Sequence, residues 1–87
     1  MPGNPINKRK TVLDEKTIFH VVQKVINEEY GIRGKTNLKP DFYKNGKLFI
    51  QSESSVWKNE LWINRTEIIF KLNKYLGSEE IKEIKFK

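Results

Sequence analysis

The dipeptide Asn45-Gly46 lies between two short segments in which apolar and polar residues alternate. A two-residue type I′ turn requires positive φ at both of its central positions, which asparagine followed by glycine tolerates well. We therefore predict a β-hairpin, in which alternation divides the side chains between two faces. One face carries Tyr43, Leu48 and Ile50. The opposite face carries Phe42, Lys44, Lys47, Phe49 and Gln51.

Helical spacing before and after the hairpin predicts two helices. The first begins near Thr11 or Asp14, either of which can contribute to its cap, and ends at Gly31. Its apolar face consists of Ile18, Val22, Val25 and Ile26. The second is capped by Ser54-Ser55 and ends at Gly77. Its apolar face consists of Trp57, Leu61, Ile68, Leu72 and Leu76.

The segment after Gly77 alternates Ile84 and Phe86 with charged residues, as a strand with one buried face does. The predicted fold is α+β of order α-β-β-α-β, with two helices packed on one face of a three-stranded sheet. A chain of 87 residues forms one small domain, which we place at residues 11–87. Residues 1–10 contain two prolines, a glycine and a basic cluster, and they are predicted to form a disordered arm.

The composition narrows the possible functions. The chain has no cysteine, so disulfides, thiolate metal ligands and a cysteine nucleophile are excluded. His20 is the only histidine and has no nucleophile pattern near it, so we expect no enzyme activity, metal or cofactor. No apolar run approaches the roughly 18 residues that span a bilayer, and the first residues lack a secretory signal, so we expect a soluble cytoplasmic protein. The net charge of +6 favours contact with a polyanion.

The polar face of the hairpin is the main candidate for nucleic-acid contact. Helices on one side of a sheet leave the other side wet, so Phe42 and Phe49 are expected to be exposed rings among lysines. Rings stack on bases and ammonium groups neutralise phosphates in single-strand binding. The rings could instead form a simple cross-strand pair, or be covered by the arm or a second subunit. The candidate residues are Lys8, Arg9, Lys10, Phe42, Lys44, Lys47, Phe49, Lys85 and Lys87. The first three could equally form an ordinary solvated tail.

A second candidate surface surrounds Trp62. Trp62 lies roughly 140° around the second helix from Trp57, so Trp57 belongs to the core stripe and Trp62 projects elsewhere. Arg65 and Ile69 follow at i+3 and i+7. Tryptophan beside arginine is typical of a protein-binding hot spot, although Trp62 could equally cover the edge of a small core.

A further pattern relates the sequence to a known family. Its central part is Pro40, Tyr43, Asn45-Gly46, Leu48, Ile50, Ser54-Ser55, Trp57 and Leu61. Its closing part is Ile68-Ile69, Leu72-Asn73, Gly77, Ile81, Ile84 and Phe86. Roughly three quarters of the chain thus resembles the DciA family of bacterial proteins, which have a KH-like domain. Gly31 falls where this family has a glycine after its first helix, and Ile26 falls where it has a tryptophan.

The resemblance implies a short stand-alone member with a KH-like fold. It also implies a non-enzymatic DNA-replication accessory that contacts the DnaB-type replicative helicase and single-stranded DNA and assists helicase loading. The helicase would contact the surface around Trp62. One alternative is a stand-alone KH-like RNA-binding module, and another is an interaction domain that dimerises through Phe42 and Phe49.

The segment Gly31-Ile-Arg-Gly34 matches the GxxG pattern with which KH domains clamp a nucleic-acid backbone. In a KH unit this loop joins the two core helices. Here it lies between the first helix and the hairpin, and Gly31 is already explained as a helix terminator. We therefore favour the structural role of Gly31 over a clamping role for this segment.

Overall fold

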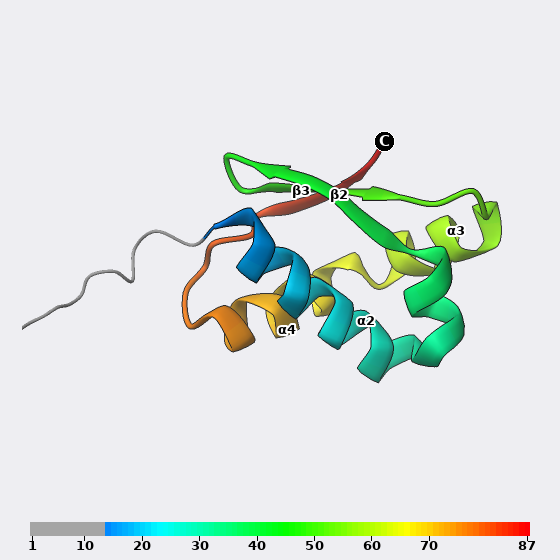
Figure 1. Ribbon diagram of the computed structural model, residues 1–87, viewed down its shortest axis with the longest axis horizontal. Helices are drawn as coiled ribbons and strands as arrows, with labels where there is room; N and C mark the ends of the chain where they lie inside the picture. Colours follow the sequence, from blue (N-terminus) through cyan, green and yellow to red (C-terminus); the bar gives the residue numbers. More distant parts are fainter. Residues whose placement is uncertain (1–13) are drawn as a thin grey trace, which may run out of the picture.

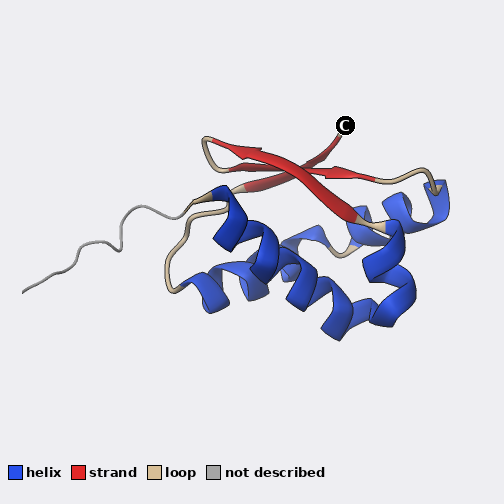
Figure 2. Ribbon diagram, in the orientation of Figure 1, coloured by secondary structure: helices blue, strands red, loops and turns tan. Residues whose placement is uncertain are grey.

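The computed structural model describes residues 14–87, and the predicted arm at residues 1–10 lies outside this range (Figure 1). The elements are α2 (Glu15–Asn37), β2 (Lys39–Lys44), β3 (Lys47–Gln51), α3 (Ser55–Ile63), α4 (Arg65–Leu76) and β4 (Glu83–Phe86). The strands form one layer and the helices form a second layer against a single face of it (Figure 2). The predicted α+β class and the placement of the helices on one face are confirmed.

The hairpin has the predicted turn and register. Asn45 and Gly46 both have positive φ, at 51° and 81°. Antiparallel strands β2 and β3 pair Phe42 with Phe49, Tyr43 with Leu48, and Lys44 with Lys47. The register shifts between Pro40 and Phe42, which leaves Asp41 as a bulge near the start of β2. The alternation therefore directs Leu48 and Ile50 toward the helices, where both are buried.

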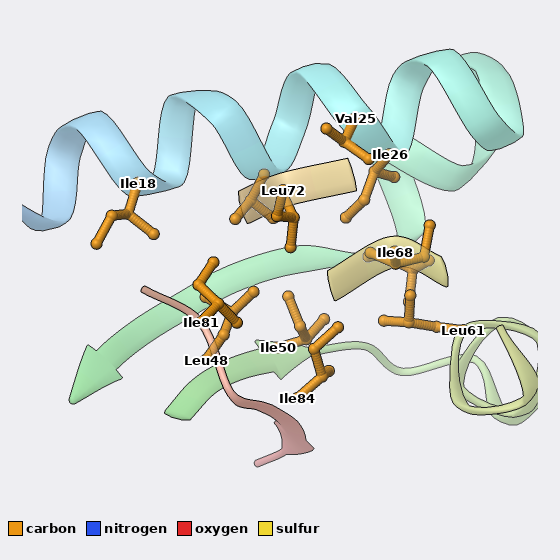
Figure 3. Packing of buried hydrophobic residues seen from close by; sticks show 12 residues of the cluster. Ile18, Val25, Ile26, Leu48, Ile50, Leu61, Ile68, Leu72, Ile81 and Ile84 are labelled. Carbon is orange, nitrogen blue, oxygen red and sulfur yellow. The ribbon is translucent and has the colours of Figure 1, made fainter. Parts of the chain in front are cut away.

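Strand β4 lies on the other side of β3 and runs parallel to it, giving a mixed sheet of order β2-β3-β4. Ile84 pairs with Leu48 and Phe86 with Ile50, so the apolar residues of β4 share the inner face, as predicted. A parallel pairing requires a long crossover, which α3 and α4 supply. The core lies between the sheet and the helices (Figure 3). Its members are Ile18, Val22, Val25, Ile26, Leu38, Leu48, Ile50, Leu61, Ile68, Leu72, Ile81 and Ile84.

The helix that begins at Glu15 is broken at Gly31, where the sequence placed its end, and a second helical segment that was not predicted continues α2 to Asn37. The Asp14 carboxylate does cap α2 by accepting a hydrogen bond from the Thr17 amide at 2.8 Å, which lowers the pKa of Asp14. Gly31 has φ 74° and ψ −168°, so it introduces a kink that residues with a β-carbon strongly resist. The helical segment after Gly31 runs to Asn37, where the Leu38 amide closes its last turn by donating to the Gly34 carbonyl at 2.8 Å.

The second helix is also interrupted, contrary to the prediction of one helix from Ser55 to Leu76. Asn64 has φ −99° and ψ 13° and separates α3 from α4. Its side-chain nitrogen donates to the Glu60 carbonyl at 3.0 Å, which also accepts from the Asn64 backbone amide at 3.3 Å, so the asparagine binds the end of α3 twice. Both predicted ends of the longer segment are confirmed. The Ser54 hydroxyl caps α3 by accepting a hydrogen bond from the Trp57 amide, and Gly77 ends α4 in the left-handed conformation.

Two polar contacts fix the connection between α4 and β4. The Asn73 side chain accepts a hydrogen bond from the Ile81 amide at 2.8 Å and donates to the Ile81 carbonyl at 2.9 Å. The Tyr43 hydroxyl lies 2.8 Å from a carboxylate oxygen of Glu80. Burial and this carboxylate raise the pKa of Tyr43 to about 12. The connection is thereby held against both α4 and the hairpin, which positions β4 beside β3.

Candidate functional site

The sheet face that points away from the helices carries the predicted aromatic pair. Phe42 and Phe49 stack with ring centroids 4.3 Å apart and an interplanar angle of 12°. Each ring covers one face of the other, and both side chains are only half-exposed. The expectation of two freely exposed rings is therefore wrong, because the cross-strand pairing brings the rings into mutual contact. What remains available to a ligand is the outer face and the edge of each ring.

The predicted lysines of this face differ in their electrostatic state. Lys44 and Lys47 flank the hairpin turn, are exposed, and form no ion pair within residues 14–87. Lys85 pairs with Phe49 across the strands, and its ammonium lies 3.5 Å from Glu83. The Lys87 ammonium lies 3.2 Å from Asp41. At the turn a phosphate would therefore meet two ammonium groups that form no ion pair within residues 14–87, with Glu83 opposite Lys47 on the neighbouring strand.

Two further residues of this face were not anticipated. Lys39 pairs with Gln51 and is exposed, so it adds a fifth lysine to the face. Uninterrupted alternation from the turn would place Pro40 opposite Gln51, so Lys39 reaches this face only because of the bulge at Asp41. Asp41 stands at the bulge, and its buried carboxylate oxygen has Lys87 as its ion-pair partner but no hydrogen bond within the described residues. The carboxylates of Asp41 and Glu83 offset two of the five lysines, and Lys39 joins Lys44 and Lys47 in forming no ion pair within residues 14–87. The basic cluster Lys8, Arg9 and Lys10 lies outside the described residues.

Trp62 lies on the helical side of the sheet. It is 46% exposed, whereas Trp57 is half-buried and packs edge-on against Tyr30 with centroids 5.5 Å apart. The Arg65 guanidinium lies 4.0 Å from the centroid of the Trp62 ring, and its Nη1 donates to the Trp62 carbonyl at 2.7 Å. The ring centroid of Phe86 lies 6.4 Å from that of Trp62. The structure thus brings together an exposed indole, an arginine and the end of β4.

Ile69 joins this surface to an open groove. It lies one turn after Arg65 on α4 and is partly buried against the core. The groove, with a volume of about 640 Å³, runs between α4 and the connection to β4, and Phe70 lies on its wall at 66% exposure. Ile63 is also exposed, directly after Trp62. Ile63 and Phe70 were not named from the sequence, although helical spacing places both on the side opposite the stripe of Trp57, Leu61 and Ile68.

The GxxG segment has a packing role in the structure. A β-carbon at Gly34 would overlap Tyr30 and would lie 3.4 Å from Trp57. Gly31 supplies the positive φ of the kink. Gly31 is therefore required by the backbone conformation of the kink, in agreement with the structural role favoured from the sequence. Gly34 is required by the close packing of Tyr30 and Trp57.

Several acidic residues that stand next to another acidic residue in the sequence bind groups on other helices or strands. Glu15 accepts from the Tyr43 amide at 3.0 Å, and Glu28 accepts from the Tyr75 hydroxyl, which raises the pKa of Tyr75. Glu29 forms an ion pair with Lys71, which raises the pKa of that ammonium. Within residues 14–87, no cluster of three or more histidine or carboxylate side chains could hold a metal ion. None of the helices in this range is long and apolar enough to cross a membrane.

Comparison with known proteins gives one result. A family model described as "Dna[CI] antecedent, DciA" matches residues 5–86. No curated protein matches the sequence. The family match extends through all the described helices and strands, including the two sheet faces and the Trp62 surface. It covers far more than half of the 87 residues, and the chain therefore belongs to the DciA family.

Proposed function

We propose that this chain is a non-enzymatic accessory of DNA replication that contacts the DnaB-type replicative helicase and single-stranded DNA and assists helicase loading. The observation that carries this proposal is the family match, because DciA is a helicase-loader family rather than a catalytic one. A KH-like arrangement of the sheet and helices is part of the proposal. In such a scaffold, positioning of the helicase depends on binding energy alone.

The distribution of charge supports contact with DNA through the outer sheet face. Lys44 and Lys47 present ammonium groups without carboxylate partners among residues 14–87, at one end of the Phe42–Phe49 stack. Phosphate neutralisation supplies most of the affinity for a single strand, and ring stacking adds about 1–3 kcal/mol per base. A base would stack on the outer face of the ring pair, with the backbone passing over the turn.

The helicase would bind on the helical side. Trp62 and Arg65 have the composition of a binding hot spot, and Ile69 extends this surface along α4. The boundary between the proposed helicase surface and the proposed DNA surface runs along β4. The Phe86 side chain lies on the inner face of this strand, and the Lys85 side chain lies on the outer face. The two proposed surfaces are thus on opposite sides of the sheet. One molecule could hold the strand and the helicase at the same time.

The DNA-binding part is tested by fluorescence anisotropy with a labelled single-stranded oligonucleotide. The double variant Phe42→Ala/Phe49→Ala should bind about tenfold more weakly, because the stacking surface is removed. Phe70→Ala is the matched control, since it removes an exposed ring from the other side of the molecule. An unchanged affinity for the double variant, with a circular dichroism spectrum like that of the wild type, would contradict the proposal. Stronger binding to an RNA of the same sequence would favour the RNA-binding alternative.

A further inference from the structure

The two edges of the sheet differ in their capacity to accept another strand. At the β2 edge, Pro40 has no amide hydrogen, the bulge at Asp41 distorts the strand, and the Tyr43 amide donates to Glu15 at 3.0 Å. Bulges, proline and coverage are the devices by which proteins close an exposed edge. The β2 edge is therefore blocked.

Among the described residues the β4 edge has no proline, bulge or covering hydrogen bond, and its protection consists of its length of four residues and its charged side chains. The Glu83 amide donates to Gly46 at 3.1 Å and the Lys87 amide to Ile50 at 3.1 Å, so the odd-numbered residues face β3. In a parallel ladder the alternate residues direct their amide and carbonyl groups to the opposite side. Ile84 and Phe86 therefore present these groups to the outer edge, where the described sheet has no further strand.

The charged side chains beside this edge are complementary to the same side chains of a second copy of the chain. Glu83 and Lys85 flank Ile84, lie on the same outer face, are both about half exposed, and form an ion pair of 3.5 Å within the chain that cross-copy pairs would replace or share. If two β4 strands meet antiparallel with Ile84 opposite Ile84 of a second copy, each Glu83 lies opposite a Lys85. Ile84 is also the residue whose amide and carbonyl point outward, so this register allows the two copies to exchange both hydrogen bonds there.

We propose that the open edge of β4 pairs antiparallel with β4 of a second copy of this chain, about a twofold axis at Ile84. The contact is isologous and joins the two sheets into one of six strands. It places both helical layers on one side and both outer faces on the other. Trp62, beside Phe86 on the helical side, lies next to the junction. The proposal is independent of the proposed function, because it concerns the chain without DNA or helicase.

The paired segment is short, so the dimer should be weak and concentration-dependent. Strand β4 has four residues, and two of them, Ile84 and Phe86, direct their backbone groups outward. Such a contact is well below the area of a stable interface, and dissociation in the range of about 10–500 μM is expected. Sedimentation velocity over a concentration series should show the average mass rising from 10.3 kDa toward twice that value.

Charge reversal tests the register. Glu83→Lys places lysines opposite lysines across the twofold axis, and Lys85→Glu places carboxylates opposite carboxylates. Each single variant should weaken the dimer at least about tenfold, because two attractive cross-strand pairs become repulsive. Both side chains are solvent-accessible, so circular dichroism should show an unchanged fold.

The same substitutions restore pairing when they are combined. A mixture of the Glu83→Lys chain with the Lys85→Glu chain should form a heterodimer, since every cross-strand pair is again of opposite charge. The double variant Glu83→Lys/Lys85→Glu should dimerise like the wild type. As a control for net charge, Lys16→Glu on α2 changes the total by the same amount as Lys85→Glu and should leave the dimer intact.

Three outcomes would overturn the proposal. One is a wild-type mass of 10.3 kDa at every concentration up to about 1 mM. Another is a dimer that is insensitive to both single charge reversals but is dissociated by Phe42→Ala/Phe49→Ala, which would place the contact on the outer face. The third is the absence of recovery in the mixture. Hydrogen exchange gives an independent readout, because the amides of Ile84 and Phe86 should become protected with concentration.

Discussion

The Arg65 guanidinium lies over the indole ring of Trp62, 4.0 Å from its centroid, and is tied to the Trp62 carbonyl by a hydrogen bond of 2.7 Å. The cation thus holds an exposed ring in one orientation before any partner arrives. Restricting a side chain in advance lowers the entropic cost of binding, which is a property of hot-spot residues. The proximity of Phe86 extends this ordered surface to the end of β4.

Trp62→Ala should reduce helicase binding at least about tenfold, because an anchor of this kind contributes about 2 kcal/mol or more. Its effect on stability should be small, since the ring is 46% exposed. Trp57→Ala is the matched comparison. It removes a half-buried ring packed on Tyr30 and should cost about 2–4 kcal/mol of stability. Melting temperature and helicase affinity are the two measurements. A large drop in melting temperature for Trp62→Ala, with binding intact, would show that the ring merely covers the core.

Lys44→Gln/Lys47→Gln should reduce the salt dependence of single-strand binding. Each phosphate contact on a single strand contributes about 0.7 to the slope of log K against log salt concentration, so losing two contacts lowers the slope by about 1.4. Lys16→Gln/Lys35→Gln on α2 removes the same charge from the helical layer and should leave the slope near that of the wild type. Equal slopes for the two double variants would mean that DNA does not pass over the hairpin turn.

Gly34→Ala should destabilise the domain by about 2 kcal/mol, because the new methyl group overlaps Tyr30 in a packed region beside Trp57. Arg33→Ala, in the same segment, changes an exposed side chain and should affect neither stability nor DNA affinity. Urea denaturation and anisotropy measure the two properties. A Gly34→Ala protein of normal stability with impaired DNA binding would instead indicate that the GxxG segment clamps the nucleic-acid backbone.

Tyr43 makes stability depend on alkaline pH. Its pKa is raised from 10.0 to about 12 in the folded state, so the folded chain keeps a proton that the unfolded chain releases. This contribution is complete below pH 10 and is lost as the pH rises toward about 12. The stability advantage of the wild type over Tyr43→Phe should therefore shrink between pH 10 and about 12, as measured from urea midpoints. Parallel pH profiles for the two proteins would contradict this role of the Tyr43–Glu80 contact.

The hairpin was predictable to the residue because its determinants are local. Two adjacent positions with positive φ are rare, and Asn45-Gly46 is the pair that tolerates them. Once the turn is fixed, alternation assigns Leu48 and Ile50 to the core and Phe42 to the outer face. The caps at Asp14, Ser54 and Gly77 are local for the same reason. Each cap acts through hydrogen bonds between groups that lie three or four residues apart in the sequence.

The features that the sequence did not reveal depend on tertiary packing. The apolar spacing from Trp57 to Leu76 continues across Asn64, so periodicity gave no sign of the break between α3 and α4. The stacking of Phe42 on Phe49 was open among several alternatives, because exposure depends on how two rings settle against each other. The parallel position of β4 depends on the crossover and has no local signal.

The most direct test of the central claim is to mix the purified chain with the replicative helicase of the same organism. Size-exclusion chromatography with light scattering at moderate salt then reports whether the two co-elute. The account predicts a complex that contains both proteins and that is lost with Trp62→Ala. Separate elution, with single-strand binding retained, would contradict the adaptor role and would leave a nucleic-acid-binding module that shares only the sequence pattern of its family.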